Sequence, residues 1–153
     1  MTSVTLYSDG ASKGNPGPGG YGTIVSFTDS KGEVHELELT EGFKETTNNR
    51  MELLGVIKGL ESLNRPCEVL VISDSKYVVD AFNEHWVDSW LKTGWKKGTV
   101  KNIDLWERLL KAMEPHKVKY QWVKGHAGHP ENERCDRLAS DSAEEAGAAT
   151  QES

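Results

Sequence analysis

The fold is set by the stretch Val4-Thr-Leu-Tyr-Ser-Asp9, which has the pattern of a β-strand with a carboxylate at its end. Its apolar and polar side chains alternate and Gly10 follows, which is the periodicity of a strand closed by a turn residue. Such a strand is a rigid mount for Asp9. One carboxylate does little chemistry alone, so we expect other acidic side chains to reach the same place from separate elements.

The composition indicates one globular domain. A chain of 153 residues is long enough for one hydrophobic core and too short for two ordinary ones. No apolar run approaches the roughly 18 residues of a membrane span. The first residues show no secretory signal, so we expect a cytoplasmic protein with reduced cysteines. Residues 1–146 are predicted to form the domain and residues 147–153 a flexible tail.

The charge distribution bears on nucleic-acid binding. A net charge of −6 argues mildly against it, because a basic balance is the usual footprint. Residues 86–102, however, carry four lysines and three tryptophans against one aspartate, and the acidic residues 131–153 supply most of the negative charge. Cations beside aromatic faces are typical of a nucleic-acid groove. The alternative is a helix with tryptophans in the core, which we favour for Trp86 and Trp106.

The remaining periodicities predict an α/β protein. Residues 10–20 are dense in Gly and Pro and predict a loop, either a plain hairpin connection or exposed N–H groups facing a sugar-phosphate chain. The G-x-G-x-x-G pattern in residues 17–22 is not a dinucleotide site, because residues 21–27 have strand periodicity. The further predicted strands cover 33–43, 68–73 and 118–123, and the predicted helices cover 51–63, 75–83, 102–113 and 131–145.

Three further acids stand near the ends of these elements. We predict Glu52 in the first turn of a helix, Asp74 directly after a buried parallel strand, and Asp136 near the start of the last helix. Taken singly, Glu52 and Asp136 have an alternative role, which is to complement a helix dipole, and we favour it for Glu52. The alternative role for Asp74 is to cap a helix. Four clustered carboxylates with Asp9 would repel one another unless hard cations bind them. Two Mg²⁺ ions, with Mn²⁺ as a substitute, would suit an in-line phosphoryl displacement.

The loop before the last helix carries a histidine. His126 lies between Gly125 and Gly128, so we expect a mobile side chain that titrates near neutrality and moves protons. Its spacing to His129 and Cys135 matches no fourfold zinc pattern, which argues against zinc.

Five blocks of sequence carry a more specific signal than any of these short patterns. The blocks are Ser8-Asp-Gly-Ala, Gly14-Asn-Pro-Gly-Pro-Gly-Gly-Tyr-Gly, Thr46-Thr-Asn-Asn-Arg-Met-Glu-Leu, Ser73-Asp-Ser-Lys-Tyr-Val and Trp122-Val-Lys-Gly-His-Ala-Gly-His-Pro-Glu-Asn-Glu-Arg-Cys-Asp. In order and content, over roughly residues 3–140, they resemble bacterial type 1 ribonuclease H. The resemblance implies a ribonuclease H-like α/β fold with a mixed five-stranded sheet, its first three strands antiparallel, flanked by helices. It also implies hydrolysis of the RNA strand of RNA-DNA hybrids, leaving 5′-phosphate and 3′-hydroxyl ends.

The resemblance further implies residue roles. The metal-binding acids are matched by Asp9, Glu52, Asp74 and Asp136, and the histidine that assists proton transfer or product release is matched by His126. Residues that read 2′-hydroxyls in the minor groove are matched by Asn15, Asn48 and Asn49. A pocket for a DNA-strand phosphate is matched by Thr47, Arg50 and Asn102. A basic handle that grips the DNA strand is matched by Trp86, Trp90, Trp95 and the nearby Lys92, Lys96, Lys97 and Lys101.

Two departures from the family pattern concern substrate binding. Lys76 stands where the family has an amide that reads the groove, which predicts a phosphate contact, and the handle is shorter and less basic. We therefore expect weaker hybrid binding with a shallower salt dependence than in a lysine-richer relative. The chain is expected to be a monomer without an obligate protein partner. The alternatives are a catalytically silent hybrid-binding module, although all four acids are present, and another nuclease or strand-transfer enzyme on the same fold.

Overall fold

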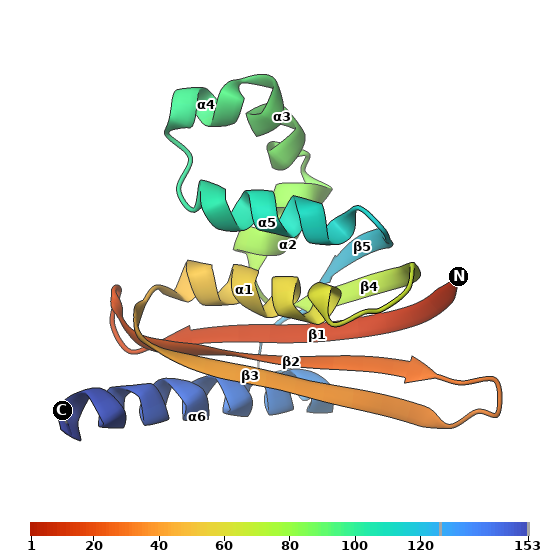
Figure 1. The fold of residues 1–153 in the computed structure, drawn as a ribbon, viewed down its shortest axis with the longest axis horizontal. Helices are drawn as coiled ribbons and strands as arrows, with labels where there is room; N and C mark the ends of the chain where they lie inside the picture. The colour runs from red at the N-terminus through yellow and green to blue at the C-terminus, as the bar shows by residue number, and fades with distance from the viewer. Residues whose placement is uncertain (126, 153) are drawn as a thin grey trace.

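The computed structural model describes residues 1–125 and 127–152, which form one mixed sheet covered by helices (Figure 1). The strand order is β3-β2-β1-β4-β5. The strands β1, β2 and β3 pair antiparallel, whereas β4 and β5 run parallel to β1. This arrangement confirms the predicted sheet. The bounds are β1 Thr2–Ser12, β2 Gly17–Thr28, β3 Val34–Thr46, β4 Cys67–Ser73 and β5 Lys117–Trp122.

The helices lie on both faces of the sheet. Figure 1 shows α1, α2 and α5 on one face and α6 on the other, while α3 and α4 project away from the sheet beyond α5. No helix in the described part of the chain is long and apolar enough to cross a membrane. The bounds are α1 Asn48–Glu61, α2 Lys76–Asn83, α3 Trp86–Lys92, α4 Gly94–Gly98, α5 Ile103–Met113 and α6 Pro130–Glu152. The backbone of α6 thus continues beyond residue 145, where the sequence predicts its end.

Helix α1 packs closely against β1, and this brings side chains of the helix to the end of the strand. Alternate residues of β1, among them Leu6 and Ser8, are buried under α1, as strand periodicity requires. Two glycines of α1 face them. A Cβ atom at Gly55 would lie 2.2 Å from Ser8 Oγ, and one at Gly59 would lie 2.5 Å from Leu6 Cδ1. The helix axis can approach the strand this closely only because both side chains are missing.

The Gly-rich residues 10–20 are mostly strand, so the prediction of a long loop there is wrong. β1 and β2 pair up to Ser12 opposite Gly19, and only residues 13–16 connect them. The glycines of β2 do not form turns. They allow α6 to pack closely against the strand. A Cβ atom at Gly22 would lie 2.3 Å from the carbonyl oxygen of Cys135 on α6. The strand conformation of residues 17–22 confirms that their glycine pattern is not a dinucleotide site.

Candidate active site

Three carboxylates from three elements converge at one edge of the sheet. Asp9 lies near the end of β1, Asp74 follows β4, and Glu52 belongs to α1. Since β1 and β4 are parallel neighbours with Tyr7 opposite Ile72, their ends carry Asp9 and Asp74 to the same place. One oxygen from each of the three carboxylates lies within 4.8 Å of the others. The chain therefore builds a compact cluster of hard oxygen donors.

Glu52 belongs to this cluster and does not serve the helix dipole. Helix α1 begins at Asn48, so Glu52 is beyond its first turn, and its side chain is only 5% exposed. Its Oε1 accepts a hydrogen bond of 3.0 Å from the backbone N–H of Gly10. Its Oε2 is buried and has no hydrogen-bond partner among the described residues. A bound cation would satisfy this buried acceptor.

The cluster is electrostatically strained. Burial, and then the negative charge of Asp74, raises the pKa of Asp9 from 3.8 to about 7. Burial and the charges of Asp9 and Asp74 likewise raise the pKa of Glu52 well above its usual range. Both shifts have the sign expected for carboxylates that share a site. A cation bound between them would lower the pKa of both carboxyl groups.

Asp136 borders the same cleft from α6. The cleft is lined by Asp9, Asp74 and Asp136 together with the residues 124–125 that follow β5. The first-turn acids of α6 are Glu131 and Glu133, so a role in the helix dipole does not account for Asp136. In the same cleft, the buried Oδ1 of Asn132 has no hydrogen-bond partner among the described residues. His126 lies outside the described residues.

The neighbourhood of Asp74 shows how β4 passes into α2. The N-cap of α2 is Ser75, whose Oγ accepts from the N–H of Val78 at 3.4 Å, so the capping role considered for Asp74 is wrong. The backbone carbonyl of Asp74 accepts a hydrogen bond of 3.0 Å from Trp122 Nε1. The Lys76 ammonium lies 4.8 Å from the centre of the Trp122 ring, a cation–π geometry. Lys76 is therefore held on the Trp122 ring, whose indole N–H contacts the backbone of Asp74.

Cysteine chemistry plays no part in this cluster. Cys135 is fully buried in α6 under the sheet, and burial raises the pKa of its thiol to about 12. Cys67 is also buried, on β4, and neither residue forms a disulfide. Because only the thiolate binds metal, a buried thiol with a raised pKa is a poor ligand. This agrees with the argument from spacing against zinc.

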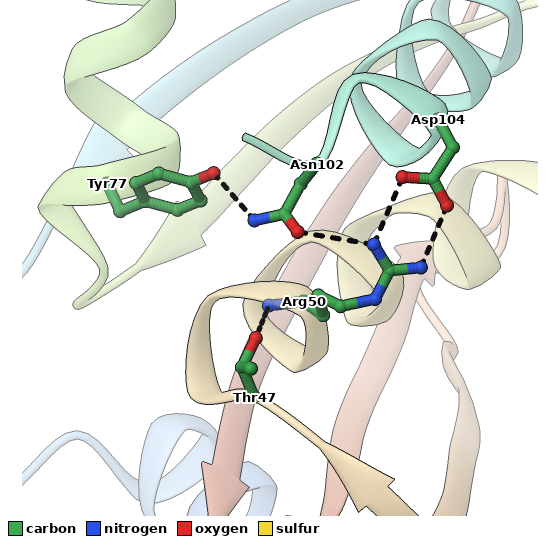
Figure 2. Close-up of polar contacts among 5 residues, drawn as sticks. All are labelled: Thr47, Arg50, Tyr77, Asn102 and Asp104. Carbon is green, nitrogen blue, oxygen red and sulfur yellow. Dashed lines mark hydrogen bonds and ion pairs between the residues drawn. The ribbon is translucent and has the colours of Figure 1, made fainter. Parts of the chain in front are cut away.

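The three residues predicted for a phosphate pocket lie together at the start of α1, as Figure 2 shows. Thr47 caps α1, its Oγ1 accepting from the N–H of Arg50 at 3.3 Å. The Arg50 guanidinium donates to Asn102 Oδ1 at 3.2 Å and forms a two-pronged ion pair with Asp104 at 3.0 and 2.8 Å. Asn102 Nδ2 in turn donates to the hydroxyl of Tyr77 at 3.1 Å. Sequence reasoning named the first three residues, and their role in binding phosphate stays a prediction. It missed their contacts with Asp104 and Tyr77, which join parts of the chain that are distant in sequence.

The three asparagines lie on the surface beside this pocket. Asn15 Oδ1 accepts a hydrogen bond of 3.3 Å from the N–H of Asn48, which ties the connection after β1 to the start of α1. The side chains of Asn48 and Asn49 are exposed. All three amides are therefore available on the same side of the molecule as the start of α1.

The predicted handle corresponds to α3 and α4, and its tryptophans differ in burial. Trp106 is fully buried, as predicted, whereas Trp86 is 43% exposed, so its assignment to the core is wrong. The reason is that Trp86 opens α3, a short helix in which only Val87 is buried. Trp90 packs edge-on against Trp106 with ring centres 5.3 Å apart, and Trp95 follows at 6.2 Å from Trp90. The handle is thus anchored to the core by a row of indoles.

The lysines of the handle are exposed, and two of them, Lys96 and Lys97, stand on an unusual turn. Trp95, Lys96 and Lys97 all have positive φ angles, from 52° to 58°, between Gly94 and Gly98. The single turn α4 is therefore left-handed, which costs about 1–2 kcal/mol for each residue with a side chain. In the sequence, the flanking Gly94 and Gly98 are the feature that indicates such a turn. Lys92, Lys96, Lys97 and Lys101 are all exposed.

Comparison with known proteins gives one consistent result. The family model described as RNase H matches residues 1–144. The ribonuclease H of Lachnoclostridium phytofermentans is 61% identical over 145 residues, covering 92% of each chain. That of Desulforamulus reducens is 56% identical over 142 residues, covering 91% of this chain and 86% of the relative. Among solved structures, LC9-RNase H1, a type 1 RNase H with the type 2 active-site motif, superposes with a TM-score of 0.86 at 33% identity, covering 95% of this chain and 74% of that one. LC11-RNase H1, solved in complex with an RNA/DNA hybrid, has a TM-score of 0.65 at 25% identity, with 94% and 99% covered.

Proposed function

The chain belongs to the ribonuclease H family, and we propose that it hydrolyses the RNA strand of RNA-DNA hybrids at the carboxylate cluster of Asp9, Glu52, Asp74 and Asp136. The observation that carries the proposal is the convergence of Asp9, Glu52 and Asp74 from three elements to within 4.8 Å. The family match over residues 1–144 includes all four acids. A hybrid-binding module without catalysis would have no need to keep three mutually repelling carboxylates together.

The residues of the cluster fit divalent metal. All the donors are carboxylate oxygens, which hard cations such as Mg²⁺ and Mn²⁺ prefer. Glu52 Oε2 is buried and unpartnered among the described residues, and the pKa of Asp9 is raised to about 7, as expected of ligands without their cation. Two Mg²⁺ ions, when bound there, supply the positive charge that stabilises the attacking and leaving oxygens of an in-line displacement.

The protein's own groups then have distinct tasks. Asp74 and Asp136, which both line the cleft, orient the attacking water. Glu52 anchors the buried side of the cluster, because its Oε1 accepts a hydrogen bond from the Gly10 N–H. The water oxygen bonds to the scissile phosphorus, and the bond to the 3′-oxygen breaks, which leaves a 5′-phosphate and a 3′-hydroxyl. His126 accepts or delivers the proton that accompanies this exchange.

The surface around the cluster supports a hybrid as substrate. The exposed asparagines at the start of α1 are suited to 2′-hydroxyls, which only the RNA strand carries. The Arg50 pocket and the lysines of the handle are suited to phosphates of the DNA strand. Lys76, held on the Trp122 ring, adds a cation beside Asp74. We expect the protein to act as a monomer in the cytoplasm, without an obligate protein partner.

The test is a substrate panel. A strand-labelled RNA-DNA hybrid, single-stranded RNA, duplex RNA and duplex DNA are each incubated with the protein, with and without Mg²⁺. Metal-dependent cutting of only the RNA strand of the hybrid is expected, and Asp9→Asn is the matched inactive control. Hybrid binding without cutting in Mg²⁺ or Mn²⁺ would instead identify a binding module, and cutting of duplex DNA would identify another nuclease of this fold.

A further inference from the structure

The hydroxyl of Tyr77 connects the hydrophobic core to the phosphate pocket. It lies 3.2 Å from Nε1 of Trp106, which is fully buried, and 3.1 Å from Nδ2 of Asn102. On its other end the Asn102 amide meets Arg50, as Figure 2 shows. The chain of contacts thus joins α2, α5 and α1. Tyr77 is half-buried, so it stands where the core ends and the pocket begins.

The direction of each hydrogen bond in this network follows from the groups at its two ends, which can only donate. The indole N–H of Trp106 can only donate, so the Tyr77 oxygen accepts from it. Arg50 can also only donate, so the Asn102 atom that faces it is Oδ1. The atom of Asn102 that faces Tyr77 is therefore Nδ2, and the Tyr77 oxygen accepts a second time. The orientation of the Asn102 amide, which is otherwise ambiguous, follows from these contacts alone.

Among the described residues, the side chain of Asn102 makes no hydrogen bond beyond this network. Asn102 precedes α5 with φ of 63°, a conformation that Asn tolerates, and its side chain does not cap the helix. Its described side-chain contacts are those with Tyr77 and Arg50. Without the Tyr77 hydroxyl, Arg50 would be the one remaining described contact of the amide, and nothing on the Nδ2 side would fix the position of the side chain.

The network leaves the binding edge of Arg50 open. Its described hydrogen bonds, one to Asn102 and two to Asp104, come from NH1 and NH2. A guanidinium has five N–H groups, so the Nε–H and one N–H of NH2 have no partner among the described residues. These two groups lie on one edge of the guanidinium, the arrangement that binds an oxyanion with two parallel hydrogen bonds. Asn102 and Asp104 together therefore orient this edge.

We propose that Tyr77 is a positioning residue for substrate binding: anchored by Trp106, its hydroxyl holds Asn102 so that Arg50 presents its open edge to a phosphate of the DNA strand. The proposal rests on the proposed function, because it requires a hybrid in the pocket. Tyr77 itself need not touch the substrate. Its removal should weaken one phosphate contact and leave the carboxylate cluster in place.

The test compares Tyr77→Phe with a matched loss of another hydroxyl. Tyr120 belongs to the same group of aromatic side chains, stacked on Phe82 at 4.4 Å, but its hydroxyl contacts Met113 Sδ at 3.2 Å, outside the network. Hybrid affinity is measured in EDTA, and cleavage is measured with Mg²⁺. Tyr77→Phe should weaken binding about three- to tenfold, with the loss in KM rather than kcat, whereas Tyr120→Phe should bind like wild type.

The readout specific to the phosphate is a set of hybrids, each with one uncharged methylphosphonate in the DNA strand. Wild type should lose affinity at one position more than at its neighbours, and Tyr77→Phe should lose that selectivity. In Arg50→Ala, which should bind about tenfold more weakly, adding Tyr77→Phe should cause no further loss.

The outcomes distinguish a wrong phosphate pocket from a wrong role for Tyr77. If Arg50→Ala binds like wild type, or if wild type shows no sensitive phosphate, the pocket itself is wrong. If Arg50→Ala is weak while Tyr77→Phe keeps wild-type affinity and phosphate selectivity, only the role of Tyr77 is overturned. Equal losses in Tyr77→Phe and Tyr120→Phe, or additive losses with Arg50→Ala, would likewise contradict positioning through Asn102.

Discussion

Replacing Asp9 by Asn should stabilise the metal-free protein at neutral and alkaline pH. The pKa of Asp9 is raised from 3.8 to about 7 in the folded state, so the unfolded chain ionises first as the pH rises. A raised carboxyl pKa lowers the stability of the fold between the two values, and each pKa unit corresponds to 1.36 kcal/mol. The shift of about 3 units gives an upper limit of about 4 kcal/mol above pH 7. Asn removes this penalty while its oxygen can still accept the 2.9 Å hydrogen bond from the Gly10 N–H.

The assay is urea unfolding followed by circular dichroism in EDTA at pH 4, 6 and 8. The gain in free energy of unfolding from Asp9→Asn should be small at pH 4, grow through pH 6 and be largest at pH 8. Asp141→Asn, on the exposed side of α6, is the control for loss of one negative charge. Adding Mg²⁺ should stabilise wild type more than Asp9→Asn and narrow the gap, because a ligand that binds only the folded state stabilises it. An equal gain at pH 4 and pH 8, or a more stable wild type at pH 8, would refute the electrostatic reasoning.

Four other substitutions test separate parts of the site. Asp74→Asn should lower turnover to below about one thousandth while sparing hybrid binding, and His126→Ala should leave an enzyme slower by about 100-fold; equal loss in the two would contradict an auxiliary role for the histidine. Gly125→Ala would place a Cβ atom 2.6 Å from Asp74 Oδ2, so calorimetry should find weaker Mg²⁺ binding with unfolding unchanged, and unaltered metal affinity would count against the geometry. Lys76→Gln should make the slope of log affinity against log salt shallower by up to about 0.9; an unchanged slope would mean that Lys76 does not neutralise a phosphate.

How far the sequence predicts this molecule depends on the range of the interactions involved. Alternation and helical spacing predicted most strands and helices, because each pattern reports one local face, whereas the order of the strands in the sheet came from the family resemblance. The strands around residues 10–20 were missed, since the role of Gly20 is to admit Ser142 and Ala139 of α6, more than 100 residues later in the chain. Asp9 and Asp74 were predicted from strand ends, but the burial of Glu52 depends on how closely α1 approaches β1. Tyr77 gave no signal, because its partners on α5 are distant in sequence.

Helix α1 joins the carboxylate cluster to the proposed phosphate pocket through its geometry. Glu52 and Arg50 are two residues apart, which on a helix means a rise of about 3 Å and nearly opposite directions. Glu52 therefore faces β1 and the carboxylate cluster, while Arg50 faces α5 and the phosphate pocket. The glycine contacts that hold α1 on β1 fix both sites at once. The distance along the hybrid between the bound DNA phosphate and the cleaved RNA bond is consequently a property of one rigid helix, and a single methylphosphonate in the DNA strand should suppress cleavage at one RNA position rather than at all of them.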